Sequence, residues 1–135
     1  MAKLSFYLFE KSPERQVESA CRLCRKILRQ PERIWLWCWD AGLRQQLDER
    51  LWSFDAAGFI AHGIDQQDAP VCISAQLPDA ADWIVFNFNN QALEQYAKFS
   101  HIIEIIENNE PAKIIGREKF KQYRRWGIEP QTFKL

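Results

Sequence analysis

Residues 4–39 read LSFYLFEKSPERQVESACRLCRKILRQPERIWLWCW and contain one complete strand–helix–strand pattern. The two ends of this stretch, residues 4–9 and 34–39, are short apolar and aromatic runs of the kind that form buried strands. Between them, Ser12 and Pro13 are typical of an N-cap and a first helical residue, and apolar residues then recur at helical spacing. The stretch therefore predicts a buried strand, a helix and a second buried strand.

The rest of the chain continues this alternation. Apolar runs predict three more strands, at residues 71–75, 83–88 and 101–106. Helical patterns predict helices at residues 41–52, 89–99 and 111–126. Residues 54–70 have little periodicity and read as a connection with room for a short edge element. The pattern predicts a single α/β domain over residues 1–135, a three-layer sandwich with a mostly parallel sheet of about five strands.

Composition excludes several classes of protein. Of the 135 residues, 47% are hydrophobic, which is enough for a real core and argues against disorder. The formal net charge is zero, so the surface as a whole is not expected to bind nucleic acid. Neither a signal peptide nor an apolar run long enough for a membrane span is recognisable. We expect a cytoplasmic protein with no membrane contact and with reduced cysteines.

The sequence offers no catalytic, cofactor or metal site. The first strand–helix turn, residues 9–15, lacks the glycines with which this kind of sheet binds phosphate, so the topology resembles that of nucleotide-binding proteins without a phosphate loop. Cys21 and Cys24 form a CxxC motif, but they lie on one face inside a predicted helix and have no second pair. Core packing is therefore favoured over zinc or redox chemistry. His62 and His101 belong to no recognisable motif, and we expect no enzyme activity from this chain alone.

Two sets of aromatic residues allow two interpretations each. Trp35, Trp37 and Trp39 alternate along one predicted strand, which favours an aromatic layer under a helix over a base-stacking platform. Another set lies at a helix end and in the following connection, where a protein interface is favoured over the chain's own core. This second set consists of Trp52, Phe54 and Phe59.

The last predicted helix concentrates positive charge. Residues 111–127 contain six basic side chains and one acidic side chain, which gives +5, so the remaining residues sum to −5. Arg117, Phe120, Lys121 and Arg124 have the spacing of one helical face. Such a face suits an acidic peptide with an apolar end. A row of phosphate contacts to nucleic acid and a simple solvated helix remain alternatives.

Several short motifs together resemble a known family. They are Phe6-Tyr7-Leu8, Leu51-Trp52 followed by Phe59 and His62, and the run REKFKQYR at residues 117–124. In this order and spacing they look like the chi subunit of bacterial DNA polymerase III holoenzyme, over essentially the whole chain.

The resemblance implies a non-catalytic subunit of the polymerase assembly with two partners. One is the psi subunit, whose contacts would fall on Trp52 and Phe59, with Phe54 beside them. The other is the acidic, phenylalanine-ending C-terminal tail of single-stranded DNA-binding protein, held by Arg117, Phe120, Lys121 and Arg124. DNA would then be reached indirectly, and a helicase is a further candidate partner. Phe120 stands where a familiar member has a tyrosine, which keeps the ring and removes the hydroxyl. Residues 132–134 also resemble that relative's ending, without a role we can assign.

Overall fold

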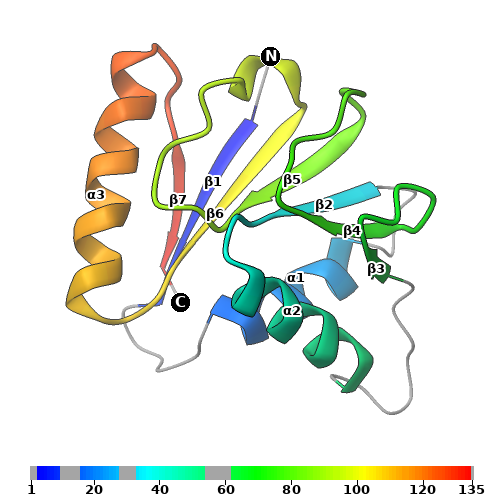
Figure 1. Cartoon of the computed structure of the whole chain (residues 1–135). Coiled ribbons are helices and arrows are strands. Elements are labelled where there is room, and N and C mark those ends of the chain that lie inside the picture. Colours follow the sequence, from blue (N-terminus) through cyan, green and yellow to red (C-terminus); the bar gives the residue numbers. More distant parts are fainter. Residues whose placement is uncertain (1–2, 10–15, 28–32, 54–61, 135) are drawn as a thin grey trace.

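The computed structural model describes residues 3–9, 16–27, 33–53 and 62–134 of the chain. Ser12, the expected N-cap, lies outside these residues. Figure 1 shows the elements, which in chain order are β1 (Lys3–Leu8), α1 (Gln16–Ile27), β2 (Arg33–Trp37), α2 (Ala41–Ser53), β3 (His62–Ile64), β4 (Val71–Ser74), β5 (Trp83–Asn87), the 3-10 helix η1 (Tyr96–Lys98), β6 (His101–Ile106), α3 (Glu110–Arg125) and β7 (Gln131–Lys134).

One parallel sheet organises the domain. Its seven strands run in the order β3-β4-β2-β5-β6-β1-β7. Every neighbouring pair is parallel, and β1 lies between β6 and β7. The predicted fold class is confirmed. A parallel sheet needs crossover connections on its faces, and here helices supply three of them.

Two hydrophobic cores lie on opposite faces of the sheet. On one face, α1 and α2 cover residues such as Ile34, Leu36 and Ile73. On the other face, α3 packs on Leu4 and Phe6, among others. Figure 1 shows the same division, with α1 and α2 together and α3 apart from them. Neighbouring β1 and β6 thus lead to helices on opposite faces, and the carboxyl ends of such strands are where open α/β sheets bind ligands.

Only two of the three alternating tryptophans form the expected buried aromatic layer. Trp35 and Trp37 are buried, and their indole N–H groups donate to the backbone oxygens of Gln76 and Ala75. The chain after β4 therefore lies against them, where the sequence predicted a helix. Trp39 lies beyond the end of β2 and is 49% exposed, although its ring still contacts that of Trp37.

The sheet has two strands more than the estimate of about five. β3 is the short edge element that the sequence allowed within residues 54–70. β7 was missed because its sequence, Gln-Thr-Phe-Lys, has only one strongly apolar residue and all four residues are exposed. An edge strand of this kind carries no core pattern, so the hydrophobic periodicity cannot reveal it.

The predicted helix at residues 89–99 is wrong except for η1. Before η1, groups of this segment bond to residues outside it. The amide of Leu93 donates to the hydroxyl of Tyr123, and the carbonyl of Gln91 accepts from Asn87. Tertiary hydrogen bonds therefore replace the helical ladder. Across the part of the chain that the structure describes, no helix has the length and apolarity to cross a bilayer.

Candidate functional site

Helix α3 begins and ends where its sequence predicts. The side chain of Asn109 caps the first turn by accepting from the amide of Ala112 at 2.9 Å, and Pro111 lies near the start. Gly127 follows the helix with a φ of 92°, a left-handed conformation that favours glycine. The chain then turns back into β7, so that α3 and β7 run side by side in opposite directions (Figure 1).

The side chains of α3 divide by face. Gly116, Lys119 and Tyr123 are buried against the sheet. Arg117, Lys121 and Arg124 are exposed along the outer flank, and Phe120 lies at the border between the two. The helix thus turns the ring of Phe120 inward and the three charges outward.

A pocket of about 430 Å³ opens between α3 and the strands beside it. It is lined by Phe6, Leu8, Phe9, Ile106, Glu107, Lys113, Gly116, Arg117, Phe120, Lys121 and Thr132. Three of the four predicted tail-binding residues are among them, and Arg124 is not. The carboxyl ends of β1 and β6 contribute to the lining, which places the pocket at the topological switch point of the sheet.

The pocket floor is apolar, and α3 lies close to the sheet there. A Cβ added to Gly116 would be 2.8 Å from Cδ1 of Ile106, so a larger residue here would require the Ile106 side chain or the helix to shift. The ring of Phe120 meets the buried ring of Phe6 edge to face, with 5.3 Å between centroids. These contacts fix one wall of the pocket.

The rim of the pocket is basic. Lys113 joins Arg117 and Lys121, and sequence reasoning missed it as a site residue although it stands four residues before Arg117. Lys121 lies 3.6 Å from Glu118, but both side chains are about two-thirds exposed, so the pair is weak. Arg124 pairs at 3.7 Å with Glu129, outside the lining. The ion pairs that Lys121 and Arg124 form are therefore weak, and an anionic ligand could replace them.

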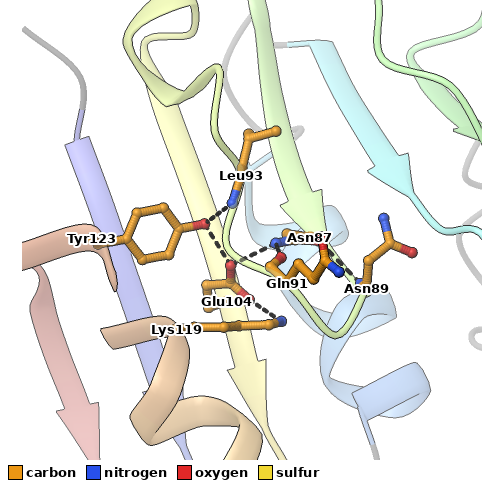
Figure 2. Close-up of polar contacts among 7 residues, drawn as sticks. All are labelled: Asn87, Asn89, Gln91, Leu93, Glu104, Lys119 and Tyr123. Carbon is orange, nitrogen blue, oxygen red and sulfur yellow. Dashed lines mark hydrogen bonds and ion pairs between the residues drawn. The ribbon is translucent and has the colours of Figure 1, made fainter. Parts of the chain in front are cut away.

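One of the six basic residues counted in this region does not belong to the surface. Lys119 is 6% exposed, and its Nζ lies 2.8 Å from Oε1 of the fully buried Glu104 on β6. Figure 2 shows Lys119 and Tyr123 reaching Glu104 from α3, while Asn87 reaches it from β5. The Tyr123 hydroxyl donates to Oε2 at 2.7 Å and the Asn87 amide donates to the same oxygen at 2.8 Å.

This buried network fixes α3 to the sheet through the side of the helix that faces away from the basic rim. Burial, and next the Glu104 carboxylate, raise the pKa of Tyr123, so its hydroxyl stays protonated and donates. Beyond Asn87 the contacts continue. The backbone N–H of Asn89 donates to the side-chain oxygen of Asn87, and the side-chain oxygen of Asn89 accepts from the backbone N–H of Trp39. Nδ2 of Asn89 is buried without a hydrogen-bond partner among the described residues.

The second predicted interface is only partly described. Trp52 is 60% exposed on the last turn of α2, and its ring meets that of His62 at 5.1 Å between centroids. The His62 ring in turn lies 3.1 Å from the backbone oxygen of Asp48. Phe54 and Phe59 lie outside the described residues.

The cysteines and His101 do not form a reactive site. Cys21 and Cys24 are fully buried in the core, as favoured, and burial raises the pKa of Cys21 to about 12. Burial, and next Lys3, lower the pKa of His101 to about 4, so its ring is neutral at pH 7 and bonds to Ser5. Among the described residues, no group of three or more histidine, cysteine or acidic side chains is placed to hold a metal ion.

The fold and the pocket define a parallel α/β domain of the nucleotide-binding type, without a phosphate loop and with a basic-rimmed pocket at its switch point. A family model described as DNA polymerase III chi subunit, HolC, matches residues 1–131. The chain therefore belongs to the DNA polymerase III chi subunit family. Its place is that of an accessory subunit in DNA replication.

Individual relatives agree with this assignment. A protein of Pseudomonas aeruginosa named DNA polymerase III subunit chi is 30% identical over all of this chain and 98% of its own. Proteins of the same name from Haemophilus influenzae and Escherichia coli are 27% and 23% identical, each over 98% of this chain and 97% of their own. Among solved structures, the C-terminal domain of S. cerevisiae Dbp5, bound to Gle1 and IP6, is similar with a TM-score of 0.60. The two are 14% identical, and the match covers 99% of this chain and 90% of the Dbp5 chain. At this identity the likeness shows the fold alone.

Proposed function

We propose that this chain is a non-catalytic adaptor of the replication polymerase. It binds the acidic, phenylalanine-ending C-terminal tail of single-stranded DNA-binding protein in the pocket beside α3. Through the surface around Trp52 it binds the psi subunit, and it thereby links the clamp loader to coated lagging-strand DNA. A helicase is a candidate for the same second surface.

The composition of the pocket supports this function most directly. Arg117, Phe120 and Lys121 were selected from helical spacing and family resemblance, and all three line one cavity with apolar walls. A terminal phenylalanine fits the apolar interior, while the terminal carboxylate and upstream acids suit the cationic rim.

The two proposed surfaces adjoin helices on different faces of the sheet. Trp52 belongs to α2, which covers one face, and the pocket adjoins α3 on the other face (Figure 1). Because the two surfaces do not overlap, one molecule can bind both partners at once, as an adaptor requires. An exposed tryptophan is a typical anchor of a protein interface.

Titration calorimetry with a tail peptide tests the proposal. A charge-assisted contact contributes about 1.5–3 kcal/mol, so Arg117→Ala or Lys121→Ala should weaken binding about tenfold or more. Arg125→Ala is the matched control, because Arg125 is an exposed arginine of the same helix outside the pocket lining. Equal losses in all three variants would mean that only overall charge matters, and no loss in the first two would exclude the pocket.

Direct nucleic-acid binding by the basic helix is the alternative. A phosphate-binding row needs no apolar pocket, and Lys119 is unavailable to it because of its burial. A gel shift with bare single-stranded DNA distinguishes the two functions. A shift that Lys121→Ala removes, at a salt concentration where the tail peptide does not bind, would favour the alternative.

A further inference from the structure

Strand β7 leaves one edge of the sheet open. It pairs with β1 on one side, from Ser5 opposite Gln131 to Leu8 opposite Lys134, and is last in the strand order. On its other side it has no strand partner among the residues that the structure describes. All four of its residues are exposed. An exposed strand edge presents unpaired backbone groups and is a template for an added strand.

The open edge and the basic rim border the same pocket. Thr132 of β7 lines it, opposite the α3 side chains Lys113, Arg117 and Lys121. The two elements also match in length. The basic flank from Lys113 to Arg124 spans about 16 Å at a rise of about 1.5 Å per residue, and four strand residues span about 13 Å. An extended peptide of four or five residues would lie along both.

We propose that the acidic tail docks as an extended eighth strand on the edge of β7, so that backbone hydrogen bonds add to the side-chain contacts of the pocket. This inference rests on the proposed function and concerns how the same site recognises its ligand. It also assigns a role to β7, whose four residues are all exposed.

The apolar end of the pocket indicates the direction of the added strand. The apolar residues Leu8, Phe9 and Ile106 of the lining lie at the carboxyl ends of β1 and β6, and we place the terminal phenylalanine there. Upstream acids then extend back along α3 toward Arg124, beside the start of β7. The tail therefore runs parallel to β7, as all neighbouring strands of this sheet do.

In an added strand, every second side chain would point to the same face of the sheet, because strand side chains alternate between faces. Residues on the phenylalanine's side would face the cations of α3. Their neighbours would face the opposite side, where Phe133, 41% exposed, stacks on Tyr7 at 5.1 Å between centroids. Backbone groups alternate in the same way between those that face β7 and those that face solvent.

Tail peptides methylated at one backbone nitrogen at a time test the inference without changing the protein. Methylation removes the amide donor, so we expect losses of about three- to tenfold at alternate positions and little effect between them. Amide exchange of residues 131–133 should also slow when unmodified peptide binds. Equal affinity for every methylated peptide, or equal loss at every position, would overturn the added strand.

The controls separate this inference from the proposed function. If methylation has no periodic effect while Lys121→Ala still weakens binding, the pocket is the site and the strand edge is not used. If Lys121→Ala also has no effect, the proposed function itself is wrong.

Discussion

Lys119 shows how one residue changes the meaning of a charge count. On the sequence it is one of six cations near the end of the chain, but in the structure it neutralises Glu104 inside the protein. Two signals of this were present: a single glutamate within the apolar run of residues 102–106, and a lysine four residues before Tyr123 on the inner side of the helix. Neither signal names the partner, since the pairing depends on how α3 packs across β6.

Replacing Lys119 alone should strongly destabilise the fold. In Lys119→Met, the buried Glu104 carboxylate keeps the donors Asn87 and Tyr123 on Oε2 but loses the one on Oε1. Breaking a buried pair on one side costs about 3–5 kcal/mol. Urea unfolding should show this loss, and the double variant with Glu104→Gln should recover most of it. Wild-type stability of the single variant would contradict the role of the pair.

Among the helices and strands, those with strongly periodic sequences were predicted correctly, and those with weak patterns were not. The buried strands and α3 follow from apolar runs and from the capping residues Asn109 and Gly127. β7 and the segment after β5 do not, because one is exposed and the other is held by tertiary hydrogen bonds such as that from Leu93 to Tyr123. For the candidate site, helical spacing grouped the residues on α3, but the walls supplied by β1, β6 and β7 required the fold.

The distance between α3 and the sheet should control the pocket. Gly116→Ala places a methyl group against Ile106 and should either push that side chain into the pocket or lift the helix. We expect tail affinity to fall several-fold by calorimetry, even though alanine favours helix formation.

A second substitution controls for this effect. Ile106→Val removes the Cδ1 atom that the new methyl group would approach most closely, so the double variant should regain affinity. If Gly116→Ala binds the tail as tightly as the wild type, the close approach is not what shapes the site.

At the scale of the whole molecule, the sheet separates two binding surfaces. Trp52→Ala should abolish co-purification with psi and leave the affinity for the tail peptide unchanged, because the tryptophan is exposed and lies outside the pocket. Thermal unfolding should change only slightly, through loss of the ring contact with His62. Loss of both partners, together with a lower melting temperature, would show that Trp52 is part of the chain's own core.

In the proposed function, the pocket beside α3 receives a terminal phenylalanine under a basic rim. Its most direct test is calorimetric titration of the wild-type protein with the tail peptide and with the same peptide lacking that phenylalanine. Full burial of the ring contributes about 1.5–3 kcal/mol, so the shortened peptide should bind at least about tenfold more weakly at equal salt. Equal affinity for the two peptides would contradict the claim and leave only attraction between opposite charges.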